Sequence, residues 1–130
     1  MKALGIDFGE KRIGLAISDE TKTFARELDI LSPKEFWDRI VSIANENEIG
    51  VLVLGLPMGV SGQETEKTKE AREFRVQLVE ITKLPVEFMD ERFSSQMAVT
   101  ISGSKKNLDS LAAQILLQNW LDKRKLNFTD

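Results

Sequence analysis

The stretch that decides the fold is Leu4-Gly5-Ile6-Asp7-Phe8-Gly9-Glu10-Lys11-Arg12-Ile13-Gly14-Leu15-Ala16-Ile17-Ser18-Asp19. Two runs of alternating apolar residues flank a short turn whose glycine can take a positive φ, and this pattern predicts a β-hairpin. Alternation along the first strand places Asp7 on the same face as two small residues, Ala3 and Gly5. The sequence therefore predicts open space around Asp7, enough for a metal ion or a phosphate, although a carboxylate that caps the turn is an equal alternative.

The bulk composition predicts one globular domain over residues 1–130, with 42% hydrophobic and 30% charged residues. No apolar run approaches the ~18 residues of a membrane span. Glycine and aspartate interrupt the N-terminal segment, so no signal-peptide core is expected there. Cysteine is absent, which excludes disulfides and thiolate chemistry. We therefore expect a cytoplasmic protein that does not contact a membrane.

Histidine and tyrosine are also absent, which removes the usual general base and the commonest metal ligand. A Ser-His-Asp triad is impossible within one such chain. An enzyme of this composition must use carboxylates, lysines, hydroxyls, its backbone and a bound ion. The net charge of -3 gives no global attraction to nucleic acid. Any affinity for phosphate must be local, or mediated by a cation.

Beyond the hairpin, apolar periodicity and capping residues predict alternating strands and helices. The expected segments are a strand over 23–30, a helix after Ser32 that ends at Gly50, a strand over 51–56, a glycine loop over 57–62, a helix over about 65–83, a strand over 85–89, a helix from Ser94 or Ser95 to Ile101, a basic loop over 103–107 and a helix over about 108–123. This order predicts an α/β fold with helices on both faces of a five-stranded mixed sheet, in which a three-strand antiparallel meander is joined by two parallel strands.

Acidic residues follow the strands of this predicted sheet, where ligands of open α/β sheets gather. The first strand carries Asp7, the fifth leads into Asp90 and Glu91, and the last helix has Asp109 near its start. Small residues after Asp109 would let that helix lie close to the sheet. Acids that converge repel one another unless a divalent cation, Mg²⁺ or Mn²⁺, binds between them. Such ions support phosphodiester hydrolysis without histidine.

Five basic residues could hold substrate phosphates near these acids. They are Lys11, Arg12, Arg92, Lys105 and Lys106. Each feature taken alone has a simpler interpretation. Asp109 could only complement the helix dipole, Asp90 and Glu91 could form a solvated strand end, and the charged side of the helix over 65–83 is expected to be a solvated face. The interpretation of these acids as a metal site is favoured because the predicted topology gathers them at one edge of the sheet.

Four motifs resemble, in order, the signatures of the YqgF (RuvX) family, and together they cover nearly the whole chain. They are residues 6–19, Gly55-Leu56-Pro57, Asp90-Glu91-Arg92-Phe93-Ser94-Ser95 and Leu108-Asp109-Ser110-Leu111-Ala112-Ala113-Gln114-Ile115-Leu116-Leu117. The resemblance implies a ribonuclease H-like fold, akin to that of Holliday-junction resolvases. It also implies a nuclease that acts at the 5′ end of precursor 16S ribosomal RNA. An older interpretation of the family is a resolvase of four-way DNA junctions.

The same resemblance implies that Asp7, Glu91 and Asp109 are the metal-binding acids, with Asp90 the less favoured member of its pair. The chain departs from the family pattern at Asn107, where members often have glycine, and at 94–95, where they often have threonines. The loop after 57 is only loosely similar. These departures bear on substrate contacts rather than on the fold.

Four functions remain open at this stage. The first is a metal-dependent nuclease of precursor rRNA, and the second is a resolvase of branched DNA, which would act as a homodimer rather than a monomer. The third is a nucleic-acid-binding or ribosome-assembly module without turnover, which the negative net charge favours slightly. The fourth is an actin-like or sugar-kinase-like ATPase, because Asp7-x-Gly9 also resembles the phosphate loop of those enzymes. They enclose the nucleotide between two such domains, whereas this chain has room for one.

Overall fold

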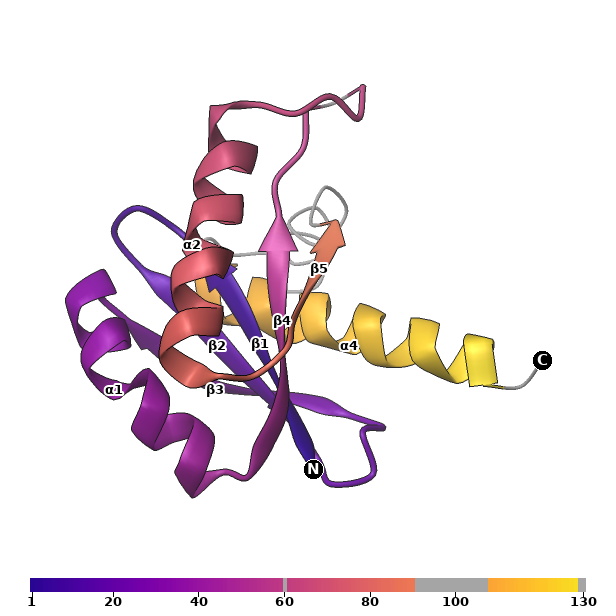
Figure 1. Ribbon diagram of the computed structural model, residues 1–130. Coiled ribbons are helices and arrows are strands. Elements are labelled where there is room, and N and C mark those ends of the chain that lie inside the picture. Colours follow the sequence, from indigo (N-terminus) through magenta and orange to yellow (C-terminus); the bar gives the residue numbers. More distant parts are fainter. Residues whose placement is uncertain (60, 91–107, 129–130) are drawn as a thin grey trace.

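A five-stranded mixed sheet forms the centre of the molecule (Figure 1). The computed structural model describes residues 1–59, 61–90 and 108–128, with the side chains of 108–110 and 125–128 left out of the description. The elements are β1 (Lys2–Phe8), β2 (Ile13–Ser18), β3 (Ala25–Leu31), α1 (Pro33–Glu46), β4 (Ile49–Leu56), α2 (Glu66–Thr82), β5 (Val86–Asp90) and α4 (Leu108–Phe128). The helix predicted from Ser94 or Ser95 to Ile101 lies outside the described residues.

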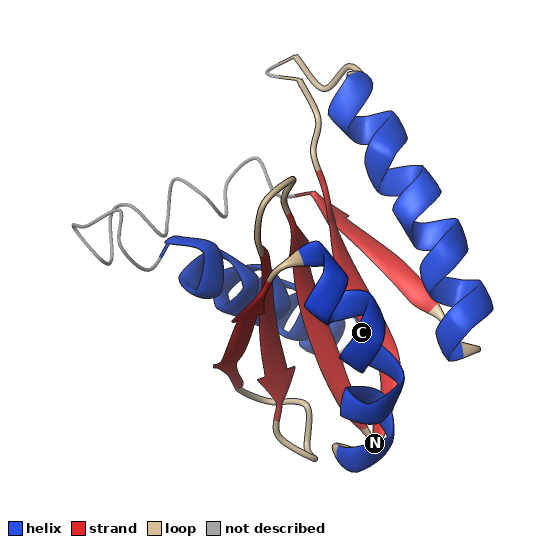
Figure 2. Cartoon of the chain, turned by 90° about the vertical axis from the view of Figure 1, so that its left-hand side faces the viewer, coloured by secondary structure: helices blue, strands red, loops and turns tan. Residues whose placement is uncertain are grey.

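The sheet has the strand order β3-β2-β1-β4-β5. β1, β2 and β3 form an antiparallel meander, and β4 and β5 add in parallel to β1, as predicted. α1 and α2 cover one face of the sheet and α4 covers the other, where it runs across the strands (Figures 1 and 2). The carboxyl ends of β1, β4 and β5 consequently meet at one edge, which we call the rim.

Each face of the sheet has its own apolar core, because side chains alternate along the strands. Leu4 and Ile6 of β1 pack with α1 and α2, whereas Ala3 packs with α4. β4 is buried on both faces, which explains its continuous apolar run. α2 contributes Ala71, Phe74 and Leu78 to the buried residues, whereas the side chain of Ile81 is 46% exposed.

α1 begins at the predicted capping box, in which the side chains of Ser32 and Glu35 each accept a hydrogen bond from the other residue's backbone N–H. The predicted end of this helix at Gly50 is wrong. α1 ends at Glu46, the chain turns through Glu48 at a φ of 53°, and Gly50 already lies inside β4. A non-glycine residue in the left-handed conformation thus makes the turn that the sequence pattern assigned to glycine.

Two other boundaries differ from the predictions. The predicted third strand begins at 23, but β3 begins at Ala25, because the Asp19 carboxylate holds the backbone N–H groups of Thr23 and Phe24 in a turn. The predicted last helix ends at 123, but α4 continues to Phe128, since neither glycine nor proline follows Lys123. None of the helices in the described residues is long and apolar enough to cross a membrane.

Candidate functional site

Asp7 lies near the rim end of β1 and is half-buried. Its partner across the antiparallel ladder is Gly14, and Gly5 precedes it on the same face of β1. The parallel register of Ile6 with Leu54 brings a third glycine, Gly55, level with Asp7. The predicted glycine-lined surroundings of Asp7 are therefore present, and a ligand can approach the carboxylate closely from this face.

α4 packs unusually close to β1 on the face that carries Asp7. A Cβ atom built on Gly5 would lie 2.8 Å from the Cβ of Leu117 and 3.2 Å from the carbonyl oxygen of Ala113. Ala113 is fully buried, which confirms that small residues let this helix approach the sheet. Asp109 lies in the first turn of α4, one turn before Ala113, while its side chain is not among those described.

The fifth strand presents its residues alternately to the two faces of the sheet. Met89 pairs with Gly55 and packs against the α4-side core, whereas Phe88 packs against the core on the opposite face. Alternation then places Asp90, the register partner of Leu56, on the Phe88 face. The predicted Glu91, Arg92, Lys105 and Lys106 lie outside the described residues. Within the described part of the chain, no group of three acidic side chains is arranged to hold a metal, so the three-acid site stays a prediction.

Gly9 shapes the turn between β1 and β2, but not in the way that the sequence suggested. The predicted hairpin is present, but Gly9 does not use the positive φ that glycine permits, since Gly62, at a φ of 84°, is the one glycine with a positive φ among the described residues. Gly9 is required for a steric reason. A Cβ atom at this position would lie 2.6 Å from the backbone oxygen of Arg12, so any side chain would force the turn open.

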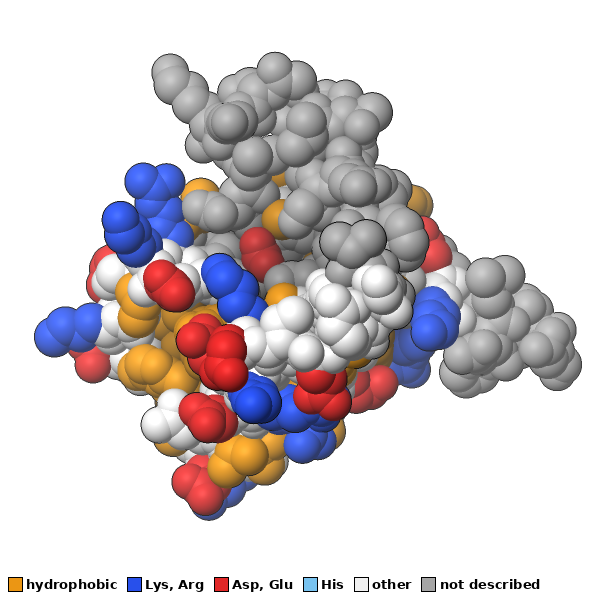
Figure 3. Space-filling view, turned by 90° about the horizontal axis from the view of Figure 1, so that it is seen from above, with side chains coloured by type: hydrophobic (Ala, Val, Ile, Leu, Met, Phe, Trp, Pro, Cys, Tyr) orange, Lys and Arg blue, Asp and Glu red, His pale blue; other side chains and the backbone are white. Residues whose placement is uncertain are grey.

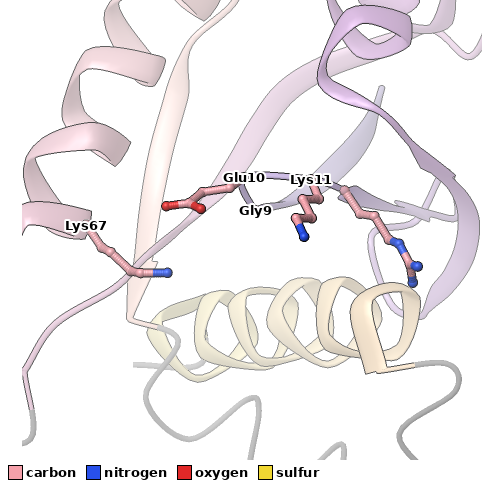
Figure 4. Close-up of a pocket in the computed structure, with 5 residues that line it drawn as sticks. Gly9, Glu10, Lys11 and Lys67 are labelled. Atoms are coloured by element: carbon pink, nitrogen blue, oxygen red, sulfur yellow. The ribbon is translucent and has the colours of Figure 1, made fainter.

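A cavity of about 360 Å³ opens between this turn and the start of α2. Its lining residues are Gly9, Glu10, Lys11, Arg12 and Lys67. Figure 4 shows Lys67 reaching in from α2 and Lys11 from the turn, with both amino groups directed into the space between them. Lys11 and Arg12 thus lie together at the rim, and their binding of substrate stays a prediction. Lys67 was not predicted from the sequence, because the charged side of α2 was expected to be solvated, although α2 begins directly after the loop that leaves the rim end of β4.

The charges around this cavity are unbalanced. Three cationic side chains line it together with one carboxylate, Glu10. Among the described residues, neither Lys11 nor Lys67 takes part in an ion pair, whereas nearby on α2 Lys69 pairs with Glu66 at 3.6 Å. Figure 3 views the molecule from above, where Lys and Arg side chains lie interspersed with Asp, Glu and apolar ones. The cavity is suited to an anionic ligand.

Thr68 fixes the start of α2 against the end of β4. Its buried hydroxyl donates a hydrogen bond to the carbonyl oxygen of Pro57 and accepts one from the backbone N–H of Thr65 at 2.9 Å. The Thr65 side chain caps the helix in return. This network ties the segment that follows β4 to the first turn of α2, so the backbone that carries Lys67 is held in a fixed place beside the rim.

A second cavity, of about 160 Å³, lies between β5 and α4 and offers less binding chemistry. The indole N–H of Trp120 donates to the carboxylate of Glu87 at 3.3 Å, and the Arg124 guanidinium lies 4.8 Å from the centre of the Trp120 ring. Two of its charged groups therefore already contact the same tryptophan. Trp120 itself is buried in the core and does not form a platform for a base.

Asp19, at the end of the same opening stretch, has a structural role. Its carboxylate accepts hydrogen bonds from the Thr21 hydroxyl at 2.6 Å and from the backbone N–H groups of Thr23 and Phe24 at 2.7 and 3.1 Å. These hydrogen bonds, led by the one from Thr21, stabilise the charged form and lower the pKa of Asp19 to about 2. The turn that Asp19 holds is at the opposite end of the sheet from the rim.

The chain resembles known proteins both in sequence and in fold. A family model described as "RuvX: Holliday junction resolvase" matches residues 1–123. A relative from Maridesulfovibrio salexigens is 36% identical over 132 residues, which cover 93% of this chain and 98% of that protein. A relative from Dictyoglomus turgidum is 37% identical over 138 residues, which cover 98% of each chain. Both relatives carry the name "Putative pre-16S rRNA nuclease".

Two solved structures have the same fold at low sequence identity. RuvC of T. thermophilus, in complex with a Holliday junction substrate, matches with a TM-score of 0.58 at 17% identity over 96% of each chain. The fowlpox virus resolvase, in complex with Holliday junction DNA, matches with a TM-score of 0.58 at 16% identity over 95% of this chain and 99% of that one. These matches confirm the expected ribonuclease H-like fold. Together with the family model and the relatives of more than one third identity, they show that the chain belongs to the RuvX family.

Proposed function

We propose that this chain is a nuclease that uses a divalent cation, Mg²⁺ or Mn²⁺, to hydrolyse phosphodiester bonds near the 5′ end of precursor 16S rRNA. The observation that carries the proposal is the position of Asp7. Its carboxylate lies on a glycine-lined face, at the same rim as the cavity that Lys11, Arg12 and Lys67 line. The names of the curated relatives support RNA as the substrate.

The residues present fit a divalent cation, because hard oxygen ligands are what Mg²⁺ and Mn²⁺ prefer. We assign Asp7, Glu91 and Asp109 as the ligands. β1 and α4 are in close contact where Gly5 meets Ala113. Asp7 lies about 7 Å beyond Gly5 along β1, and Asp109 lies about 6 Å before Ala113 along α4. Strand alternation favours Glu91 over Asp90, because Glu87 and Met89 share the α4-side face and Asp90 does not.

Each part of the rim then has a task in the reaction. When bound, the divalent ion supplies an activated water and stabilises negative charge on the phosphate. Asp7 holds the ion, and the glycines beside it leave room for the scissile phosphate to approach. Lys11 and Arg12 bind phosphate oxygens of the substrate and keep the strand in place. Histidine is not needed for any of these tasks.

A second candidate is a resolvase of four-way DNA junctions. The description of the family and the two solved resolvase structures favour it. This activity would require a homodimer with two rims spaced across the junction. The alternative without turnover is a module that binds nucleic acid at the rim during ribosome assembly.

One experiment separates these functions. Purified protein and an Asp7→Asn variant are incubated with labelled precursor rRNA and with labelled four-way DNA, in Mg²⁺, in Mn²⁺ and in chelator. We expect cation-dependent RNA cleavage that the variant lacks. Cleavage of the junction alone would establish the second candidate, and binding of either substrate without cleavage would establish the third. A separate assay with ATP tests the ATPase hypothesis, which ATP hydrolysis by the purified protein would support.

The assignment of Glu91 and Asp109 is tested separately, by Glu91→Gln and Asp109→Asn. Both variants should lose cleavage while their thermal unfolding stays unchanged or shifts upward, because each relieves repulsion between carboxylates in the cation-free protein. Strong destabilisation of both would instead mark the two acids as structural caps.

A further inference from the structure

We propose that the cavity between the β1–β2 turn and the start of α2 is a phosphate subsite for a nucleic-acid strand, and that Lys67 is a substrate-binding residue within it. The inference rests on the proposed function. It adds Lys67 to the substrate-binding residues. It also states that this subsite recognises the phosphate backbone of the strand rather than its bases.

The first argument is the state of the charges on α2. Two carboxylates close to Lys67 in the sequence already have other partners: Glu66 pairs with Lys69 at 3.6 Å and Glu64 with the Arg72 guanidinium at 3.0 Å. In the part of the chain that the structure describes, Lys67 and Lys11 form no ion pair. Their amino groups face the same cavity from two different elements (Figure 4). Two ammonium groups directed into one space repel each other, and the single carboxylate of Glu10 cannot balance them together with Arg12. A bound phosphate adds the negative charge that removes the remaining repulsion.

The second argument is the chemistry of the lining. Among the residues that the structure describes, the cavity is lined by a glycine, a carboxylate and three cationic side chains, and by no aromatic ring on which a base could stack. Lysine binds phosphate as a point charge that does not depend on the sequence of the strand. The subsite therefore contributes affinity and register, and it carries no preference for one base over another.

The third argument is the rigidity of the position. Thr68, the residue next to Lys67, is fully buried and bound to the Pro57 carbonyl, and Thr65 caps the helix. The backbone that carries Lys67 is therefore fixed relative to the rim end of β4. Gly9 keeps the opposite wall of the cavity in place, because its turn tolerates no Cβ. Binding then orders only the ends of two lysine side chains.

The test is a binding experiment in the Asp7→Asn background, in which cleavage does not interfere. Affinities for a labelled precursor-rRNA fragment and for a labelled four-way DNA are measured at several salt concentrations. Lys67→Glu should weaken binding about tenfold at low salt and reduce the slope of log K against log salt by about one. Lys67→Gln should lie in between. Lys69→Glu is the matched control, since it makes the same charge change two residues away outside the cavity, and it should alter affinity less than twofold.

The outcomes separate this inference from the proposed function. If Lys67→Glu and Lys69→Glu weaken binding equally, the subsite is wrong, while cleavage by the native protein still stands. If the native protein cleaves nothing but the Lys67 effect persists, the nuclease is wrong and the subsite belongs to a binding module. If the Lys67 effect depends on the bases of the strand, recognition of the backbone is wrong. The intermediate variant Lys67→Gln gives the same answers if charge reversal disturbs folding.

Discussion

The two ends of the central sheet each carry an aspartate from the same opening stretch, and the two aspartates have different surroundings. At one end, Asp19 accepts three hydrogen bonds from its own turn, which hold the chain between β2 and β3. At the other, Asp7 lies half-buried on a glycine-lined face beside a cavity with three cationic side chains. The carboxylate of Asp19 accepts hydrogen bonds from its own turn and stabilises structure, whereas Asp7 lies among glycines at the rim, where we propose that it binds a metal ion.

The largest expected difference between Asp7 and Asp19 is in the effect of their substitution on the cleavage rate. Asp7→Asn should reduce the cleavage rate by at least about 100-fold, since even outer-shell changes at metal sites cost 10–100-fold. Asp19→Asn makes the same chemical change at the far end of the sheet and should leave the rate nearly unchanged. Single-turnover cleavage assays with both variants measure the contrast. Equal losses would mean that both aspartates act through stability, and thermal melts would show this directly.

The next contrast concerns the packing that brings α4 to the sheet. Gly5→Ala places a Cβ 2.8 Å from the Cβ of Leu117, at a contact that cannot move without shifting α4. We expect destabilisation by about 1–3 kcal/mol, the usual cost of overpacking a core, with a matching loss of cleavage. Urea unfolding measures the change.

Gly50→Ala is the control for this substitution. Its new Cβ would lie 2.9 Å from the Cβ of Met1, which is 73% exposed and can shift more easily than α4, so we expect a smaller loss of stability than at Gly5. Equal effects at Gly5 and Gly50 would show that the close approach of α4 does not depend on Gly5.

The smallest contrast is the pH dependence that Asp19 contributes. Its pKa in the folded protein is about 2, below the ordinary value of 3.8, so the folded state favours the charged form. The resulting stabilisation is fully present above about pH 4 and is lost as the pH falls toward 2. The stability difference between the native protein and Asp19→Asn, measured by urea unfolding, should shrink over this range. A carboxyl titration midpoint near 3.8 by NMR would show that the three hydrogen bonds do not favour the charged form.

The sequence predicted the elements of the fold well, because alternation and capping are local signals. The faces of β1 and β2, the capping box of α1 and the buried character of β4 all follow from residue spacing. Two features that depend on how the backbone packs were missed. Gly9 is required by the Arg12 carbonyl rather than by its φ, and Lys67 belongs to a cavity that exists only once α2 packs beside the turn. The rim acids beyond Asp7 stay predictions from the sequence.

Addition of Mn²⁺, followed by NMR, tests most directly whether the Asp7 end of the sheet is the end that binds metal. Mn²⁺ broadens the signals of nuclei near it. We expect substoichiometric Mn²⁺ to broaden the amide signals of Gly5 to Gly9 while those of Asp19 to Phe24 stay sharp, and we expect Asp7→Asn to abolish the broadening. Broadening centred on the Asp19 turn, or broadening at β1 that persists in Asp7→Asn, would contradict the assignment of Asp7 as a metal ligand.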